Sequence, residues 1–538
     1  MLAHIATAGV QMNEVVLNLG LNSFDKGGAW QKALQLLSGM ERHSCRADVF
    51  SISSAISACQ RGAQWQMGLQ ALPDMLASRI LPSQVTFNAS VSACEKGGAW
   101  QLALQCFSKM LEMQCTPSVV TFGSAISACA ARAQWRTALQ LLWEMEPCGI
   151  PPNTISCNAA LSACANSAKW QLGGHLLECM MQGTMEPNVV SFSAAISACE
   201  GGGQWQVALG LLGEMPFLDI VPNVVAFSSA VSACEKAGHW QAALEVLAWM
   251  QDVKVKPNEI TLNSCISACA KASQWQWALQ TLSSMSLRKL TADCVSFNSA
   301  MNACGQGKQW ELAVCMLAEL PSARLCPDLV SYNTSISAAA AAALWEVALA
   351  LFEAIGVARL APNEVSFNAS ISACEKAAQW QRACQQLSDM RRRHLAPGVI
   401  SYNSSISACE KGSQWQVALK LFGSLYSCSL FPNRVTFSAA ISACEKSGQW
   451  KVALLLLSTM LAQRVTPNEI TFNAAIAAAE KGRQWQLALH LLSSMLSSTL
   501  EPNILSFSLA IAACQRGRYR RAVSDLLTLA SSPLPPSW

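Results

Sequence analysis

The chain of 538 residues is 52% hydrophobic, 13% charged and 7% aromatic, with a formal net charge of +4 at pH 7. This small positive charge does not by itself indicate a nucleic-acid partner, so any such role must depend on where the charges lie. No run of about 20 uncharged apolar residues occurs, because even the alanine-rich stretch 337–354 contains Glu346 and Glu353, and a transmembrane helix is not predicted.

A tryptophan recurs every 35 residues, in fourteen copies without a gap. A unit this short cannot bury its own apolar face, so the period predicts repeats that stack on their neighbours. We expect an N-terminal stub over residues 1–13, too short and too poor in Arg and Ser for a persuasive transit peptide. One continuous repeat array then runs over 14–538, and its last repeat, 504–538, is degenerate because Tyr519 comes one residue early. The repeating tryptophans are Trp30, Trp65, Trp100, Trp135, Trp170, Trp205, Trp240, Trp275, Trp310, Trp345, Trp380, Trp415, Trp450 and Trp485.

The unit 189–223 illustrates the structure expected of each repeat. Apolar residues at i, i+3, i+4 and i+7 from Phe192 predict a first helix, which the glycines 201–203 end. The same spacing from Trp205 predicts a second helix, and Pro222 closes the unit. Each repeat is thus a predicted helix-turn-helix hairpin, and the chain is all-α. The recurring Trp and Met lie on the apolar stripe of the second helix, where we expect core packing between repeats rather than a ligand.

Twelve of the 24 cysteines occupy the same position of the repeat. Equivalent positions of neighbouring repeats lie roughly 10 Å or more apart, too far for a disulfide. We therefore expect buried thiols and a reducing compartment. These cysteines are Cys59, Cys94, Cys129, Cys164, Cys199, Cys234, Cys269, Cys304, Cys374, Cys409, Cys444 and Cys514.

The 35-residue unit starts with a segment such as VVSFSAAI, carries Ala and Met in its second helix and ends in Pro-Asn. In these features it resembles the pentatricopeptide repeat family. Tryptophan at position seventeen and the recurrent SACEK segment depart from that family's pattern. The resemblance, to the P-type arrays of the family, implies a right-handed α-solenoid of about fifteen helix-turn-helix repeats. It also implies binding of single-stranded RNA, one base per repeat, through the fifth and last side chains, with an aliphatic second residue sandwiching the base.

The fifth positions are Asn or Ser in fourteen of fifteen repeats. Asn is roughly 0.6 kcal/mol worse than Ala in a helix, and its amide offers donors and an acceptor to a base. We therefore assign base recognition to these positions, with copying from a recent duplication as the alternative. They are Asn18, Ser53, Asn88, Gly123, Asn158, Ser193, Ser228, Asn263, Asn298, Asn333, Asn368, Asn403, Ser438, Asn473 and Ser508.

The last positions, which complete the base-recognition pair, are mostly Asp, Asn or Ser. These residue types directly before a helix are also what an N-cap requires, at about 1 kcal/mol each, and this alternative is the stronger one. The last positions are Asp48, Ser83, Ser118, Asn153, Asn188, Asn223, Asn258, Asp293, Asp328, Asn363, Gly398, Asn433, Asn468 and Asn503.

The second positions are all apolar and lie opposite the core stripe of the first helix. A base held between two of them would be removed from water; contact with the adjacent repeat is the alternative. We assign the base sandwich to Val190, Val225, Ile260, Val295 and Val330. The others are Val15, Phe50, Val85, Val120, Ile155, Val365, Ile400, Val435, Ile470 and Leu505.

A basic residue recurs at position thirteen, often directly after an acidic one. Contact with RNA phosphates is one interpretation, and a favourable charge at a helix C-terminus is the other. We assign phosphate contact to Lys96, Lys236, Lys271, Lys376, Lys411, Lys446 and Lys481.

The family's pairing rules predict a target when applied to these residues. Asn with Asp favours U, Asn with Ser favours C, Asn with Asn favours a pyrimidine, and Ser with Asn favours A. With the first repeat at the 5′ end, the string is U, open, C, open, pyrimidine, A, A, U, U, pyrimidine, open, pyrimidine, A, pyrimidine.

No pattern predicts catalysis, since the sequence lacks His-x-Glu, Cys-x-x-Cys and a glycine-rich phosphate loop. We expect a monomer that is not an enzyme, needs no cofactor or metal, and does not bind membranes. It would act in RNA processing, stability or translation in a mitochondrion or chloroplast by family resemblance, with a processing enzyme recruited in trans. A helical-repeat scaffold for protein partners is the alternative, although a peptide groove should vary more in charge and size along its fifth positions.

Overall fold

The computed structural model describes residues 14–40, 47–62, 64–78, 80–183, 185–288, 290–497, 500 and 502–516. The predicted stub 1–13 and most of the predicted degenerate repeat 504–538 lie outside the described residues. Within them the regular secondary structure is helical, with two helices in each of the first fourteen repeats, one described helix in the fifteenth, and no strand. The all-α solenoid of helical hairpins predicted from the sequence is confirmed.

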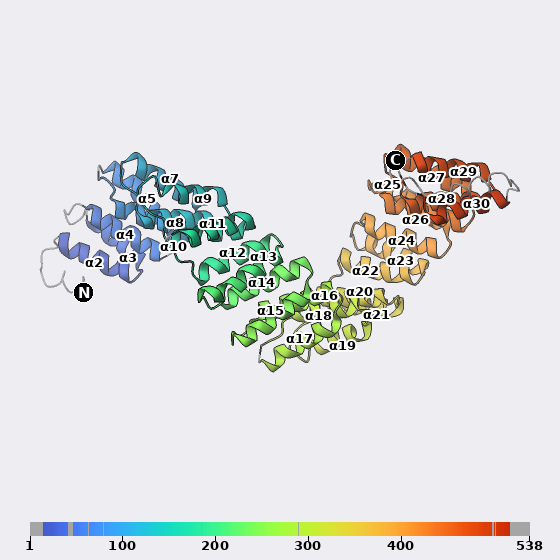
Figure 1. Cartoon of the computed structure of the whole chain (residues 1–538), viewed down its shortest axis with the longest axis horizontal. Helices are drawn as coiled ribbons and strands as arrows, with labels where there is room; N and C mark the ends of the chain where they lie inside the picture. Colours follow the sequence, from blue (N-terminus) through green and yellow to red (C-terminus); the bar gives the residue numbers. More distant parts are fainter. Residues whose placement is uncertain are drawn as a thin grey trace. The chain divides into compact units, whose positions relative to one another are not determined.

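The first helix of each repeat begins at the first position of the repeat (Figure 1). The first helices are α2 (Glu14–Lys26), α4 (Val49–Arg61), α6 (Gln84–Lys96), α8 (Val119–Ala130), α10 (Thr154–Asn166), α12 (Val189–Gly201), α14 (Val224–Ala237), α16 (Glu259–Lys271), α18 (Cys294–Gln306), α20 (Leu329–Ala341), α22 (Glu364–Lys376), α24 (Val399–Lys411), α26 (Arg434–Lys446), α28 (Glu469–Lys481) and α30 (Ile504–Arg516).

Every second helix begins at the repeating tryptophan. The second helices are α3 (Trp30–Met40), α5 (Trp65–Ala77), α7 (Trp100–Glu112), α9 (Trp135–Glu144), α11 (Trp170–Gln182), α13 (Trp205–Glu214), α15 (Trp240–Asp252), α17 (Trp275–Leu287), α19 (Trp310–Glu319), α21 (Trp345–Val357), α23 (Trp380–Arg392), α25 (Trp415–Ser427), α27 (Trp450–Ala462) and α29 (Trp485–Ser497). A short 3₁₀ helix, η2 (Met215–Leu218), follows α13.

In every hairpin whose turn the structure describes in full, position fifteen lies in the left-handed region. The φ angles there lie between 54° and 76°, at glycines such as Gly238 and also at Ala133, Lys308 and Arg483. A residue with a Cβ in this region costs roughly 1 kcal/mol, so the turn tolerates non-glycine residues because the two flanking helices determine its path. This turn separates the two helices of a repeat.

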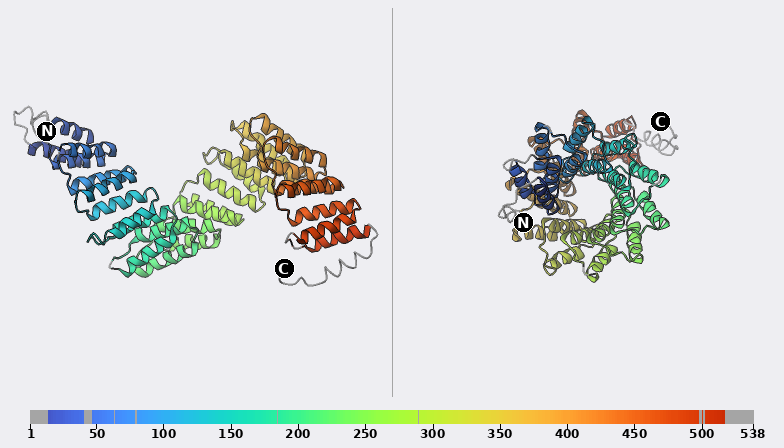
Figure 2. Two further views of the ribbon diagram at one scale, coloured as in Figure 1. Left: turned by 90° about the horizontal axis from the view of Figure 1, so that it is seen from above. Right: turned by 90° about the vertical axis from the view of Figure 1, so that its left-hand side faces the viewer.

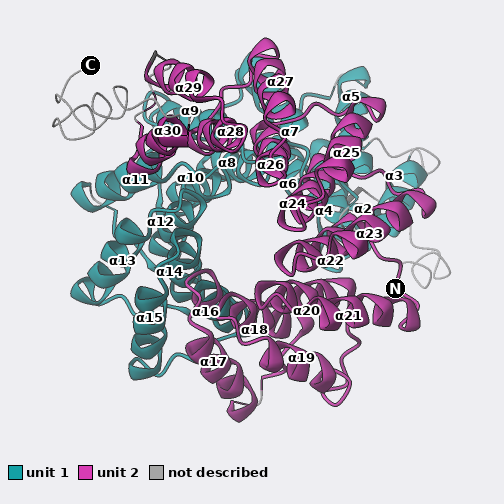
Figure 3. Cartoon of the chain, turned by 90° about the vertical axis from the view of Figure 1, so that its right-hand side faces the viewer, with its two compact units in different colours: residues 1–268 teal, residues 269–538 magenta. Residues whose placement is uncertain are grey.

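The chain divides into two compact units, residues 1–268 and 269–538, coloured separately in Figure 3. In each unit a first helix packs on the second helix of its own repeat and on neighbouring first helices. Two further views show the hairpins stacked side by side within each unit (Figure 2). Inside unit 1, α8, α10, α12 and α14 follow the inner edge of the curve and α9, α11, α13 and α15 its outer edge (Figure 3). Inside unit 2, α26 and α28 likewise lie inward of α27 and α29.

The core is built from the predicted apolar stripes. Phe192, Ile196 and Cys199 of α12 and Ala208 of α13 are at most 1% exposed, as is Met215 directly after α13. Burial of this apolar surface, at about 25 cal/mol per Å², stabilises each hairpin only when its neighbours cover it. The burial of Met215 confirms the prediction that the recurring methionine is a core residue.

The tryptophans differ from the prediction, because all fourteen are only half-buried. Each tryptophan is the first residue of a second helix, and the rings of Trp30, Trp65, Trp170, Trp275, Trp380 and Trp450 lie against the turn of the next repeat. A Cβ added at Gly202 would lie 2.6 Å from Cδ1 of Trp170, which explains the small residue at that turn. The rings therefore serve inter-repeat packing, as predicted, from the rim of the core rather than its centre.

The twelve repeating cysteines are all buried free thiols, as predicted. Because a buried thiolate is poorly solvated, burial raises the pKa of most of them and keeps them protonated at neutral pH. The pKa is raised to about 11 at Cys164, Cys199, Cys234, Cys269, Cys304, Cys374 and Cys444. In the described part of the chain, no helix has the length and apolar character needed to cross a membrane.

Candidate nucleic-acid interface

All fifteen second-position side chains project into solvent. Their exposed fractions run from 50% at Phe50 to 70% at Ile155, although every one of them is apolar. A regular line of exposed aliphatic side chains has no role in folding the repeat, and such surfaces usually contact a partner. Packing against the adjacent repeat, the alternative from the sequence, does not bury them.

The fifth and last side chains of a repeat lie within hydrogen-bonding distance of each other. Asn298 Nδ2 donates to Asp328 Oδ1 at 3.2 Å, and Asn158 Nδ2 donates to Asn188 Oδ1 at 3.2 Å. Where the fifth residue is Ser193, its Oγ lies 3.1 Å from Asn223 Oδ1. The structure thus brings these two predicted positions together beside the exposed second residue. The same pairing occurs in the repeats of Asn18, Asn88, Asn333 and Asn403.

The last position is also an N-cap, which is the alternative role that the sequence analysis gave it. Asp328 Oδ1 accepts from the Ser331 backbone N–H at 2.8 Å, and Asn223 Oδ1 accepts from Ala226 N–H at 2.8 Å. Such caps occur at thirteen of the fourteen last positions; the exception is Gly398, which has no side chain. Capping by Asp328 uses Oδ1 and leaves Oδ2 out of these contacts, so capping and base contact are compatible.

A third polar residue, missed by the sequence analysis, completes the arrangement. Ser191, the third residue of its repeat, donates from Oγ to Asn158 Oδ1 of the preceding repeat at 2.6 Å. Since Asn158 Nδ2 donates to Asn188, the flip state of its amide is defined by two contacts. The same hydroxyl contact reaches Asn18, Asn88, Asn368, Asn403 and Asn473.

Composition at the third position contained the signal for this role. Thirteen of the fifteen third residues are Ser or Thr, and all thirteen are fully buried. From the sequence, a Ser or Thr at the third helical position looks like an ordinary capping-box residue. Its second partner, the fifth residue of the preceding repeat, lies 33 residues away in the chain.

Two of the aspartates have depressed pKa values. Partial burial raises the pKa of Asp328, but hydrogen bonds from Ser331 and Asn298 outweigh it, and the pKa lies below the ordinary value. At Asp48 burial likewise raises the pKa, but hydrogen bonds from Ser51 and Asn18 outweigh this effect, and the net pKa is lowered. Both groups are therefore carboxylates at neutral pH and present acceptors only.

Gly398 lacks a recognition side chain, and another residue occupies the space. A Cβ added at Gly398 would lie 2.6 Å from Oε1 of Glu364, the first residue of the same repeat. A carboxylate thus stands where the last side chain of this repeat would otherwise begin.

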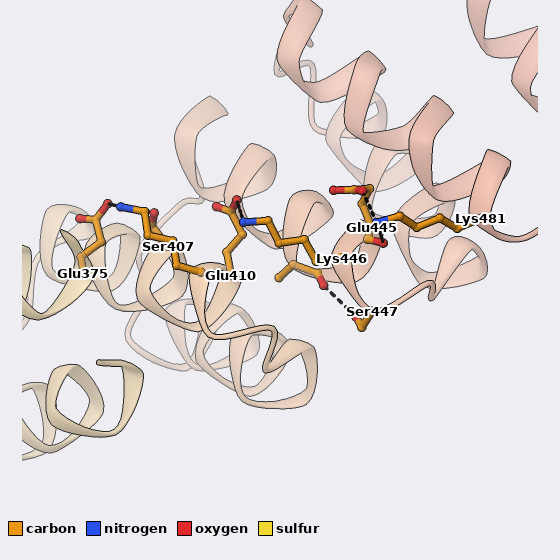
Figure 4. A network of polar contacts seen from close by, with 9 residues as sticks. Glu375, Ser407, Glu410, Glu445, Lys446, Ser447 and Lys481 are labelled. Carbon is orange, nitrogen blue, oxygen red and sulfur yellow. Dashed lines mark hydrogen bonds and ion pairs between the residues drawn. The ribbon is translucent and has the colours of Figure 1, made fainter. Parts of the chain in front are cut away.

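The predicted phosphate-contacting lysines are largely paired across repeats. Lys236 Nζ lies 3.1 Å from Glu200 Oε1, and Lys446 Nζ lies 3.0 Å from Glu410 Oε1. Figure 4 shows this ladder on successive first helices. The acidic partner belongs to the preceding repeat, 36 residues earlier, and not to the neighbouring residue in the chain. The ladder also includes Lys411 with Glu375, Lys481 with Glu445, Arg61 with Asp25 and Arg516 with Glu480.

Two of the seven predicted phosphate contacts differ from the ladder. Lys96 and Lys376 are exposed, and the residues 36 positions earlier are Gln60 and Ala340. Neither lysine has an ion pair among the described residues. Half-exposed pairs such as Lys446 with Glu410 contribute little stability and are screened by salt, but they reduce the positive potential along the first helices.

Families of helical repeats match much of the chain. A model described as "PPR repeat family" matches residues 82–131 and 222–271. A "Pentatricopeptide repeat domain" model matches 140–202, 360–412, 385–447, 428–481 and 455–516, and a "PPR repeat" model matches 260–290 and 295–325. Together these matches cover more than half of the sequence. No curated protein matches the sequence.

Solved structures share the fold along the chain. The crystal structure of the pentatricopeptide repeat protein PPR10 from maize is 21% identical, with a TM-score of 0.63 over 98% of this chain and 80% of that one. PPR10 in complex with an 18-nt psaJ RNA element is 19% identical, with a TM-score of 0.53 over 97% of this chain and 84% of that one.

Proposed function

Because this chain belongs to the pentatricopeptide repeat family, we propose that it binds single-stranded RNA, with one repeat facing one base. The observation that carries the proposal is the line of fifteen exposed apolar second residues, which follows the paired polar side chains of positions five and last. A flat base between two such residues would lose contact with water, and its edge would meet the polar pair. The RNA-bound structure of PPR10 supports this assignment by similarity of fold.

The polar pair can distinguish bases through its donors and acceptors. Asn298 with Asp328 combines an amide with a carboxylate, whereas Ser193 with Asn223 combines a hydroxyl with an amide. These arrangements present different donor and acceptor patterns at the same place in successive repeats. The predicted string from U at the first repeat to a pyrimidine at the fourteenth is our proposed target.

Phosphate contact is proposed first for the unpaired Lys96 and Lys376, whose charge is not neutralised by a neighbour. The lysines of the ladder would contribute less unless RNA displaces their glutamate partners. We further propose that the protein acts in RNA processing, stability or translation in a mitochondrion or chloroplast, as a monomer that recruits a processing enzyme in trans.

Binding to a 14-nucleotide RNA of the predicted string should be at least tenfold tighter than binding to a scrambled RNA of equal composition. The reason is that each mismatched base typically costs about 1–3 kcal/mol. Fluorescence anisotropy across a salt series measures both affinities. Equal affinities would reduce the interaction to nonspecific attraction, and no binding at low salt would favour the protein scaffold.

The third-position hydroxyl should sharpen the base preference of the preceding repeat. Replacing Ser191 with Ala removes the donor that orients the Asn158 amide, so the preference for a pyrimidine at the fifth nucleotide should fall about fivefold, the equivalent of one hydrogen bond. Competition binding with a pyrimidine or a purine at that nucleotide measures the change.

Ser156→Ala is the matched control for this variant. Ser156 Oγ donates to its N-cap Asn153 at 2.8 Å, but the fifth residue of the preceding repeat is Gly123, which has no amide to orient. Both variants lose a buried capping hydroxyl, so they should lose similar thermal stability. An unchanged preference in Ser191→Ala, or the same loss of preference in Ser156→Ala, would assign the hydroxyl to capping alone.

A further inference from the structure

A pocket of about 260 Å³ opens beside the first helix of the fourth repeat, residues 119–153. Its lining includes Val120 and Ile155, the second residues of the fourth and fifth repeats, which are 61% and 70% exposed. The pocket therefore lies where our proposed function places the fourth base, between two aliphatic side chains. Its volume is just below that of small-molecule sites, which is about 300–1,000 Å³.

Gly123 leaves open a space in this pocket that a fifth side chain would occupy. It is the one fifth residue in the array without a side chain, and a Cβ added there would meet no atom within 4 Å. In the adjacent repeat, Asn158 occupies the equivalent space and hydrogen-bonds to Asn188. A base facing Gly123 can enter further along the first helix, toward Ser127 and Glu95, which also line the pocket.

Glu95 is free of the ladder that neutralises its counterparts. Five other position-twelve glutamates pair with a lysine or arginine of the next repeat, as Glu200 does with Lys236 at 3.1 Å. The residue 36 positions after Glu95 is Ala131, which cannot pair with it. Among the residues that the structure describes, no ion pair or side-chain hydrogen bond involves Glu95. The fourth repeat, which lacks a fifth side chain, thus also lacks the basic residue that would pair with Glu95 of the third repeat, and the Glu95 carboxylate lines the pocket as an uncompensated acceptor.

Asn153, the last residue of this repeat, supplies donors to the same pocket. Its Oδ1 accepts from the Ser156 backbone N–H at 2.8 Å and from Ser156 Oγ at 2.8 Å. Its Nδ2 takes no part in these contacts and keeps two N–H groups for a ligand. The pocket therefore combines an amide donor, Asn153, with a carboxylate acceptor, Glu95.

We propose that the fourth repeat is a guanine-selective site, in which Glu95 accepts from base N–H groups and Gly123 leaves room for the purine. The proposal rests on the RNA-binding function proposed above. The Watson–Crick edge of guanine carries two adjacent donors, N1–H and the N2 amino group, beside the acceptor O6. A carboxylate matches the two donors, and the Asn153 amide matches an acceptor of the same base.

The other bases match this donor and acceptor pattern less well. Adenine turns the acceptor N1 toward a carboxylate, which repels it. Uracil offers the single donor N3–H between two acceptors, and cytosine offers an amino group beside the acceptor N3. Both pyrimidines are also too short to fill the space that Gly123 opens. The pairing rules give no base for this repeat, whereas the pocket favours guanine, the purine with two adjacent donors on its Watson–Crick edge.

Four 14-nucleotide RNAs that differ only at the fourth base test the proposal in fluorescence anisotropy with the full chain. We expect the G-containing RNA to bind about tenfold more tightly than the other three, as for a bidentate contact to guanine. Glu95→Gln, which keeps size but replaces one acceptor by a donor, should bring G to within about twofold of the other bases. Gly123→Asn should fill the pocket and shift the preference to a pyrimidine, as proposed for the repeat of Asn158 and Asn188.

Glu200→Gln is the matched control, because it changes a position-twelve glutamate that is paired with Lys236. It should leave the preference at the fourth nucleotide unchanged. Equal binding of all four RNAs, or a guanine preference that survives Glu95→Gln, would overturn the guanine site while the predicted string still binds better than the scrambled RNA. Failure of the predicted string itself would instead overturn the RNA-binding function on which the site rests.

Discussion

Replacing Asn298 with Ser and Asp328 with Asn should change the base preferred by the ninth repeat from U to A. The pair joins Asn298 Nδ2 to Asp328 Oδ1 at 3.2 Å, and the variant recreates the pair of Ser193 and Asn223 found in the sixth repeat. Each mismatch costs about 1–3 kcal/mol, so the ratio of affinities for U and A at the ninth nucleotide should change by roughly 100-fold or more.

The wild-type pair has one feature that a base would complete. Asn298 is 8% exposed, and its Oδ1 is buried without a hydrogen-bond partner. An unsatisfied buried acceptor costs about 1–3 kcal/mol, and the N3–H donor of uracil would satisfy it once the Asn298 amide turns to face the base. Asp328 contributes acceptors only, because hydrogen bonds lower its pKa despite burial.

The fold should survive both substitutions. Asn caps several first helices of this chain, so Asp328→Asn keeps the N-cap of α20. Serine at the fifth position is also tolerated, since Ser193 is 7% exposed and donates from Oγ to the Val189 carbonyl at 2.6 Å. Similar thermal melts for variant and wild type would therefore confirm that a change in binding reflects recognition.

Competition binding with RNAs that carry U or A at the ninth nucleotide measures the switch. Changing the sixth nucleotide, which faces Ser193 and Asn223, provides the internal control and should affect both proteins equally. Loss of affinity for both RNAs without a reversed preference would mean that the pair supports structure and does not select a base.

The acidity of Asp328 adds a pH test to the same experiment. Its pKa is lowered in the folded chain, so its carboxylate persists at pH values below the ordinary aspartate range, and its contribution to stability is lost only as the pH falls through the folded pKa. The wild-type preference for U should therefore be unchanged between about pH 7 and pH 5.

Features within one repeat could be predicted from the sequence. Tryptophan begins every second helix, and the glycines 201–203 end the first helix of their repeat. Both could be predicted because apolar spacing and turn residues are local signals. The opposition between the exposed second residues and the buried stripe also follows from helical periodicity. These features place the fifth and last side chains beside the exposed line.

Contacts between repeats could not be predicted in the same way. Ser191 contacts Asn158 over 33 residues, and Lys446 contacts Glu410 over 36 residues. Such separations depend on how far each repeat is displaced along its neighbour, which periodicity does not determine. The acidic residue directly before each lysine was the closer candidate in the chain, yet the glutamate of the preceding repeat is the partner.

The half-buried tryptophans have the same explanation. Periodicity places Trp170 on the apolar stripe but does not show that the stripe's first residue meets the turn at Gly202 instead of the core. The pocket beside Gly123 also depends on two absences in the fourth repeat, the missing fifth side chain and the missing basic partner of Glu95. The sequence does not show that these two absences are related, because only the folded chain brings Gly123 and Glu95 to the same pocket.

Replacing Val190, Val225, Ile260, Val295 and Val330 together with Ala should lower RNA affinity by about 100- to 1,000-fold without lowering thermal stability. Their exposed fractions run from 53% to 64%, so the fold gains little from them. Ala is moreover a better helix former than Val or Ile, by roughly 0.5 kcal/mol per residue. Each truncation removes apolar surface that a base would cover, for about 0.5–1 kcal/mol.

Leu111, Leu455 and Leu461 provide the matched control on the second helices. They are 46%, 62% and 54% exposed, and their replacement by Ala removes similar apolar surface outside the first helices. This control should keep wild-type RNA affinity in fluorescence anisotropy and similar stability in thermal melts. If both sets reduce affinity equally, the exposed second residues hold no base, and hydrophobic surface alone accounts for the binding. A loss confined to the first set would mean that RNA covers the line of second residues, because its aliphatic side chains are already folded, exposed and spaced one per repeat before RNA arrives.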